Sequence, residues 1–292
     1  MDKPESSSVE NIRKAAGSLK ELRPHYRNVL DYYEQLLIAQ EMVKDALALS
    51  PIEDSHGLPK EEAEKSMVLA NISAISFDKE LTRDLMEKMC DLRRTAGSSS
   101  ATLTNKFKAI INADGFEFET FIRDFLSRNG DAMNHLASVY GLDREFLFHV
   151  TYHSLQPSIQ SWANGAAAFL PENFSWNKGV CPVCGERPAL ATIDDQGKRF
   201  LHCSFCWQKW HVNRGLCPVC DNHDPEFLQY FYSEEEAEYR VELCEKCKTY
   251  IKCIDSRNTE RQLYPPLEHV VTLHLDMSIQ KKGYTPSSDV SF

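Results

Sequence analysis

The stretch CPVCGERPALATIDDQGKRFLHCSFC, residues 181–206, decides how this chain folds. It begins and ends with a Cys-x-x-Cys pair, and two further pairs follow at 217–220 (CPVC) and 244–247 (CEKC). A tight turn at each pair directs two sulfurs to one point. Two such turns face to face form a tetrahedral four-sulfur site for a metal, with bonds of about 2.3 Å. The pattern therefore predicts two metal sites, with the ligands Cys181, Cys184, Cys203, Cys206, Cys217, Cys220, Cys244 and Cys247.

The spacing between the pairs favours a sequential arrangement of the two sites. Eighteen residues separate the first pair from the second, and twenty-three separate the third from the fourth. Only ten residues separate the second pair from the third. The two longer separations are of the length that joins the halves of a zinc site. An interleaved arrangement, in which the first pair joins the third and the second joins the fourth, is also compatible with the spacing.

A four-sulfur site suits zinc and iron equally in geometry, so the predicted cofactors are two metal ions, zinc or iron, each held by four cysteines. Sulfur would fill every ligand position and leave no place for water or substrate, which disfavours hydrolytic catalysis. The sequence also has no Gly-rich phosphate loop and no Gly-x-Ser-x-Gly motif. We therefore expect a protein without enzymatic activity, although an iron site would leave electron transfer open.

The composition indicates what kind of protein this is and in which compartment it works. A chain of 292 residues with 42% hydrophobic and 26% charged residues is typical of a soluble protein of about two domains. Residues 1–10 are polar and lack the apolar segment of a secretory signal, and no apolar run is long enough to span a bilayer. We expect a cytoplasmic protein without stable membrane insertion. In that compartment paired cysteines indicate metal, and disulfides are the alternative.

The net charge of −10 argues against nucleic acid as a partner. Residues 176–260 carry more carboxylates than basic side chains, and eight thiolates around two divalent metals would add negative charge. Nucleic-acid readers instead cluster Lys and Arg to neutralise phosphates. We expect no nucleic-acid binding.

Periodicity and punctuation predict the domains. From about residue 24 to residue 172, apolar residues recur three or four positions apart, which is the period of an α-helix. Gly and Pro residues separate these helical segments. The last of these helices, 144–169, contains Pro157, so we expect a kink or break there. The fold class is a multidomain α+β protein, in which an all-α helical domain precedes two small β-hairpin lobes of zinc-ribbon or rubredoxin-like type and a short C-terminal helix. The predicted domains are 1–172, 173–215, 216–260 and 261–292.

Short β-prone runs lie beside the cysteine pairs and define the hairpins. The predicted strands are 191–193, 199–202, 239–243 and 250–254. Asp195, Gln196 and Gly197 form the turn between the first two. Each lobe of about 40 residues is too small to be held by an apolar core alone, so bound metal has to supply the missing stability.

Two further features lie near the cysteines. Gly185 follows the first pair, where a left-handed turn aims backbone N–H groups at sulfur, but Trp207, Asp221 and Lys248 occupy the matching positions of the other pairs. Trp210 and Arg214 lie in the ten-residue bridge between the second and third pairs. We predict that these two side chains hold the lobes together and shape a partner-binding groove, and direct contact with a partner is the alternative.

Several motifs together resemble the formate dehydrogenase accessory protein FdhE family. They are Arg199-Phe200-Leu201-His202-Cys203-Ser204-Phe205-Cys206, Trp210-His211-Val212 with Arg214, Thr249-Tyr250-Ile251-Lys252 after the fourth pair, and Thr272-Leu273-His274-Leu275-Asp276 with Gly283-Tyr284. The resemblance covers the cysteine region and the tail, and is weaker in the helical half.

The resemblance implies a cytoplasmic maturation factor with rubredoxin-like metal sites. Members of the family bind the catalytic subunit of molybdenum- or tungsten-dependent formate dehydrogenase before its export or assembly. The alternative function is a rubredoxin-like electron carrier or thiol-redox protein that acts on the metal centre of the same client.

Overall fold

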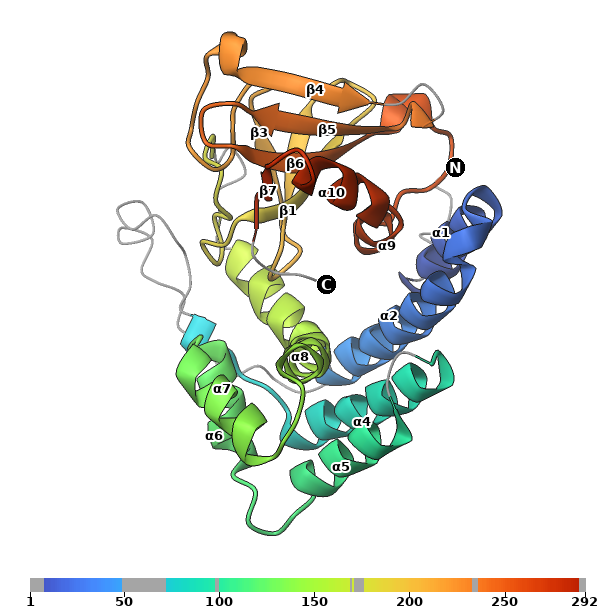
Figure 1. Ribbon diagram of the computed structural model, residues 1–292, viewed down its shortest axis with the longest axis vertical. Coiled ribbons are helices and arrows are strands. Elements are labelled where there is room, and N and C mark those ends of the chain that lie inside the picture. Colours follow the sequence, from blue (N-terminus) through green and yellow to red (C-terminus); the bar gives the residue numbers. More distant parts are fainter. Residues whose placement is uncertain are drawn as a thin grey trace. The chain divides into compact units, whose positions relative to one another are not determined.

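The structure is a computed structural model that describes residues 8–48, 72–97, 100–168, 170, 176–232 and 236–288. A helical N-terminal half precedes a β-rich region with two four-cysteine clusters, and short helices follow near the C-terminus (Figure 1). This order confirms the predicted fold class.

The described helices of the N-terminal half lie where the apolar periodicity predicts helices, with one addition. One boundary differs from the expectation, because Gly130 is the first residue of a helix capped by Asn129 and does not end the preceding helix. Asp78 caps the helix that begins at Lys79, since its carboxylate accepts the backbone N–H of Leu81 at 2.8 Å. The helix that precedes residue 24 was not predicted. The helices are α1 (Ser8–Leu22), α2 (Arg27–Ala48), α4 (Lys79–Thr95), α5 (Ala101–Ile111), α6 (Phe118–Leu126), α7 (Gly130–Val139) and α8 (Arg144–Ala167).

Helix α8 continues through Pro157, so a break there is wrong, and a kink stays a prediction. Proline has no N–H to donate to the carbonyl four residues earlier, which here belongs to His153. The side-chain amide of Gln40 in α2 donates to that carbonyl at 2.7 Å. A buried hydrogen bond from a neighbouring helix thus compensates for the donor that Pro157 lacks.

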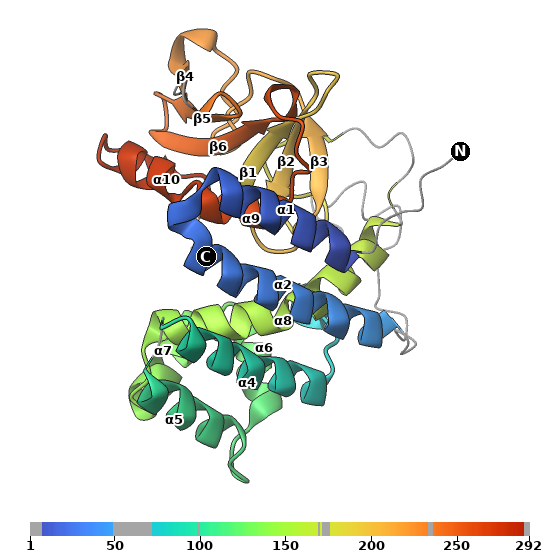
Figure 2. The same cartoon turned by 90° about the vertical axis from the view of Figure 1, so that its right-hand side faces the viewer.

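The β-rich region forms one seven-stranded sheet in the order β3-β2-β1-β6-β5-β4, with β7 also paired to β6 (Figure 2). The four predicted strands are β1, β2, β5 and β6, and the turn between the first pair of strands is at Gly197, as predicted. The strands are β1 (Pro188–Ile193), β2 (Arg199–Cys203), β3 (Lys209–Val212), β4 (Leu228–Tyr232), β5 (Tyr239–Cys244), β6 (Thr249–Asp255) and β7 (Thr285–Pro286).

The two hairpins are joined rather than separate. Strand β1 of the first hairpin pairs in parallel with β6 of the second, from Leu190 opposite Lys252 to Ile193 opposite Asp255. Side chains on these central strands, including Ala191 and Cys253, are fully buried. The hairpins therefore share a continuous apolar core, and this interface compensates for the small size of each lobe.

The tail contains two helices where one was expected, α9 (Pro265–Val271) and α10 (Leu273–Gln280). Helix α9 contacts β1, and α10 contacts β7. Lys252 of β6 donates to Asp276 of α10 at 2.6 Å, and the hydroxyl of Tyr250 donates to the same carboxylate at 2.8 Å. The motif after the fourth cysteine pair and the motif of the tail thus bind each other.

The described residues form two compact units with boundaries unlike the predicted domains. One unit contains residues 8–26 and the chain from 163 onward, and the other contains residues 27–48 and 72–162. Helix α1 groups with the β-rich region because it packs on α9. The predicted boundaries stay a prediction about which parts fold independently. None of the described helices combines the length and apolar composition that a membrane crossing requires.

Candidate metal centres

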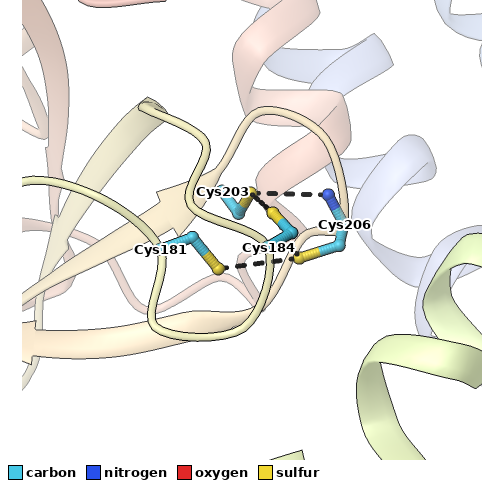
Figure 3. Close-up of side chains that lie close together, drawn as sticks. All are labelled: Cys181, Cys184, Cys203 and Cys206. Carbon is cyan, nitrogen blue, oxygen red and sulfur yellow. Dashed lines mark hydrogen bonds between the residues drawn. The ribbon is translucent and has the colours of Figure 1, made fainter. Parts of the chain in front are cut away.

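The first cluster contains Cys181, Cys184, Cys203 and Cys206, whose sulfurs converge between two turns (Figure 3). The Sγ atoms of Cys181 and Cys206 lie 3.7 Å apart, and those of Cys184 and Cys203 lie 3.3 Å apart. All four side chains are buried. One turn precedes β1 and the other follows β2, so the antiparallel β1–β2 hairpin brings them together.

The second cluster contains the other four predicted ligands. Its turn at 217–220 precedes β4 and its turn at 244–247 joins β5 to β6, so the antiparallel β4–β5 hairpin brings the two turns together. Cys217 and Cys247 have their sulfurs 3.6 Å apart, and Cys220 and Cys244 have theirs 3.7 Å apart. The structure therefore has the sequential arrangement, and the interleaved alternative is wrong.

The geometry of both clusters fits a tetrahedral metal. Four sulfurs at about 2.3 Å from a common centre lie about 3.8 Å from one another. The sulfur pairs measured above are close to this separation, and in each group all ligand atoms lie within 4.8 Å of one another. Disulfide sulfurs would be about 2.05 Å apart. The cysteines of both clusters are free thiols in the structure. Each set can hold one metal ion, and its four sulfurs suit zinc and iron alike.

The four turns share one backbone conformation although only the first has glycine. The residue after the second cysteine has a positive φ in every case: 78° at Gly185, 59° at Trp207, 54° at Asp221 and 57° at Lys248. This left-handed conformation costs a residue with a Cβ about 1–2 kcal/mol. The missing glycines therefore do not alter the turn; they make three of the four turns more strained.

Backbone and hydroxyl donors face the sulfurs. The N–H groups of Phe205 and Cys206 lie 3.4 and 3.5 Å from Cys203 Sγ. In the second cluster the Thr249 hydroxyl lies 2.9 Å from Cys247 Sγ. Burial raises the pKa of Cys247, but hydrogen bonds from Thr249, Cys220 and Cys244 outweigh it and lower the pKa to about 7. Thr249 thus stabilises thiolate charge, and sequence reasoning gave it no role because a lone threonine carries no metal-site signal.

The clusters differ in exposure. All four cysteines of the first are buried, whereas Cys220 and Cys247 of the second are partly exposed. Exposure matters for function, because solvent, a chelator or a partner can reach only sulfurs at the surface.

Gly179 brings the turns of the two clusters into contact. A Cβ at this position would lie 1.9 Å from the carbonyl oxygen of Pro218, which stands between Cys217 and Cys220. No residue other than glycine fits without moving the backbone. A single glycine two residues before the first cysteine gave no signal in the sequence, because the close approach involves a segment almost forty residues away.

Trp210 and Arg214 have different positions. Trp210 is buried in β3, opposite Leu201, and its indole N–H donates to the carbonyl of Lys178 at 3.0 Å. It therefore anchors the segment that enters the first cluster. Arg214 is exposed beside the turn at Gly197. His202 does not join the first cluster; its Nε2 lies 2.9 Å from the Thr192 hydroxyl.

A known protein family matches part of this cysteine region. The family model described as "FdhE, central domain" matches residues 180–214, which contain the whole first cluster together with Trp210 and Arg214. A protein FdhE homolog from Aquifex aeolicus is 34% identical over 148 residues, 49% of this chain and 51% of the relative. The resemblance to FdhE is confirmed.

More distant FdhE proteins match over most of the chain. A homolog from Haemophilus influenzae is 22% identical over 262 residues, 87% of this chain and 80% of the relative. The crystal structure of FdhE from Pseudomonas aeruginosa superposes with a TM-score of 0.64 at 21% identity, covering 97% of this chain and 95% of that one. The chain therefore has the fold of FdhE in both halves. The match to the Aquifex relative spans about half of that protein's length.

Proposed function

We propose that this protein is a cytoplasmic assembly factor that binds the catalytic subunit of a molybdenum- or tungsten-dependent formate dehydrogenase before export or assembly. The observation that carries the proposal is the FdhE match at residues 180–214, because it coincides with the first four-cysteine cluster. The FdhE resemblance suggests the client, and the sheet with its two four-cysteine clusters offers a surface that can contact it.

The chemistry of the clusters supports binding rather than turnover. The four sulfurs of each set occupy all positions of a tetrahedral metal, so a bound ion has no open position for substrate. The expected contribution of each metal is stability, on the order of 10–16 kcal/mol for a tight structural site. The cysteines then hold the ends of the hairpins, and the sheet between them holds the two clusters together.

A second candidate function is electron or thiol transfer to the client's metal centre, and the partial exposure of Cys220 and Cys247 favours it over a purely structural role for the second cluster. Metal analysis after purification without air separates the two functions. Ferric iron in four thiolates is red and changes colour on reduction, whereas zinc is colourless and redox-inert. A protein that contains only zinc and restores formate dehydrogenase would contradict metal-based electron transfer.

The assembly role can be tested in cells that lack the native factor. We expect formate dehydrogenase activity to be lost without this protein, and the tagged protein to co-purify with the immature catalytic subunit. Normal enzyme activity in its absence, together with no detectable complex, would contradict the proposal.

The roles of Trp210 and Arg214 can be tested in the same assay. We expect Trp210→Ala and Arg214→Ala to weaken capture of the catalytic subunit by about 1–3 kcal/mol while both metals are retained. Lys281→Ala is the control, because it removes an exposed cation beyond α10. If both variants bind as well as the control, these residues do not shape the binding surface, but the assembly role is unaffected.

A further inference from the structure

Strand β4 lies at the end of the sheet, and its only strand neighbour among the described residues is β5. Its sequence, LQYFY, contains neither Pro nor a charged residue, and its register with β5 runs without a shift from Leu228 to Tyr232. Natural sheets usually protect such an edge with Lys, Pro or a bulge, because an unprotected edge pairs with other chains. An unprotected edge of this kind therefore points to a strand-pairing partner.

The alternation of hydrogen-bonded and non-hydrogen-bonded residue pairs between β4 and β5 shows which backbone groups of β4 face outward. The N–H of Glu245 in the β5–β6 turn donates to the carbonyl of Phe227 at 2.8 Å, so these opposite residues form a bonded position. In an antiparallel ladder bonded and non-bonded positions alternate. The positions of Gln229 and Phe231 are therefore bonded to β5, and the backbone N–H and C=O groups of Tyr230 and Tyr232 point away from it.

The other side of β5 gives the same phase independently. The N–H of Asp255 at the end of β6 donates to the carbonyl of Glu238 at 2.8 Å. The backbone N–H and C=O groups of the even-numbered β5 residues therefore point to β6. Those of the odd-numbered residues, including Val241 and Leu243, point to β4.

Exposed aromatic side chains line the same strand. Tyr230 is 52% and Tyr232 68% exposed, and Phe227 just before the strand is 41% exposed. Aromatic side chains are enriched where proteins bind one another, and cross-strand aromatic pairs stabilise sheets. Within the described part of the chain, the outer edge of β4 thus combines backbone groups that have no strand partner with side chains suited to contact an added strand.

Charge selects the kind of strand that fits. Asp224 and Glu226 precede β4, and both are exposed. If β4 paired in parallel with β4 of a second copy, these carboxylates would lie beside their own copies, and like charges in that position repel. A strand with Lys or Arg at the end that lies beside Asp224 and Glu226 is instead attracted to β4.

We propose that the outer edge of β4 is a docking strand, which pairs with an extended segment of the client polypeptide that carries basic residues at one end. This proposal rests on the client binding proposed above and names the surface that performs it. The backbone groups of Tyr230 and Tyr232 supply the hydrogen bonds, and Asp224 and Glu226 select the basic end of the segment.

Substitution at Tyr230 separates the backbone contribution from that of the side chain. Tyr230→Pro removes an outward N–H without breaking the ladder to β5, since proline is tolerated where the N–H faces solvent. Tyr230→Ala is the matched control, because it removes the aromatic ring and keeps the N–H. We expect Tyr230→Pro to weaken capture of the catalytic subunit at least about tenfold more than Tyr230→Ala, with two metals retained. Equal capture by the two variants would overturn the proposal.

Amide hydrogen exchange tests the same edge in the unmodified protein and does not depend on how the proline variant folds. The amides of Tyr230 and Tyr232 should exchange rapidly in the free protein and at least about 100-fold more slowly in the complex with the catalytic subunit. Unchanged exchange in a complex that forms would overturn the docking strand and leave the assembly role intact. Failure to form any complex would overturn both.

Two further experiments test the preference for a basic segment and the alternative that β4 pairs with a second copy of this chain. Glu226→Lys should weaken capture, and more strongly at low salt than at high salt. Sedimentation of the free protein should show no self-association through β4. A dimer that is abolished by Tyr230→Pro would assign the edge to a second copy and overturn the proposal.

Discussion

Arg199 in β2 donates a hydrogen bond of 2.6 Å to the carboxylate of Glu242 in β5. Strand β2 ends at Cys203 and β5 ends at Cys244, so this buried ion pair joins the two strands that carry ligands into the two clusters. Arg199 also donates to the carbonyl of Leu216 at 3.2 Å, immediately before the third cysteine pair. One side chain thus links both cysteine clusters.

The Arg199–Glu242 pair should matter more than an exposed pair. Glu242→Leu removes the carboxylate from the almost fully buried Arg199 and from Arg240, which donates to its other oxygen at 2.8 Å. This should lower the free energy of unfolding by about 3–5 kcal/mol. Denaturant unfolding of the metal-loaded protein measures this. Glu10→Ala is the control, since it breaks an exposed pair with Lys14 and should cost less than about 1 kcal/mol. If the double variant Arg199→Met/Glu242→Leu is no more stable than Glu242→Leu, the unpaired charge of Arg199 is not the cause of the loss.

Each cluster should bind its metal separately. Because the ligands are grouped as 181/184/203/206 and 217/220/244/247, Cys181→Ser and Cys244→Ser should each remove one metal ion per chain and keep the other. Elemental analysis of the purified variants, normalised to protein concentration, gives the count. Loss of both metals from either single substitution would indicate that the clusters fold cooperatively through the shared sheet.

Chelation should empty the second cluster first. Its Cys220 and Cys247 are partly exposed, whereas all four cysteines of the first cluster are buried. In protein loaded with zinc, a coloured zinc chelator in excess should give two kinetic phases of one metal each, and the fast phase should be missing in Cys244→Ser. A fast phase that is missing in Cys181→Ser instead would reverse the assignment.

Gly179→Ala should disturb the contact between the two cysteine turns. The added Cβ would meet the Pro218 carbonyl oxygen at 1.9 Å, so backbone has to move, at a cost of about 1–3 kcal/mol. Gly165→Ala is the matched control, because that glycine lies in α8 with open space around it and alanine favours helix. Thermal unfolding should show a lower midpoint only for Gly179→Ala. Equal midpoints would show that the turns can separate freely.

The sequence by itself determined those features of the protein that depend on residues close together in the chain. Paired cysteines identify the ligands, because a Cys-x-x-Cys turn converges whatever surrounds it. Loop lengths indicate the sequential grouping, and the turn at Gly197 defines the first hairpin.

Only the tertiary structure decided what depends on residues far apart in the chain. Strands β1 and β6 pair across about sixty residues, and no local pattern encodes the partner of a buried strand. The left-handed φ of Trp207, Asp221 and Lys248 is imposed by the cysteine turns against their own preference. Gln40 allows α8 to continue through Pro157, which otherwise favours a break. In each case packing or a distant hydrogen bond outweighs a local tendency worth only about 1–3 kcal/mol.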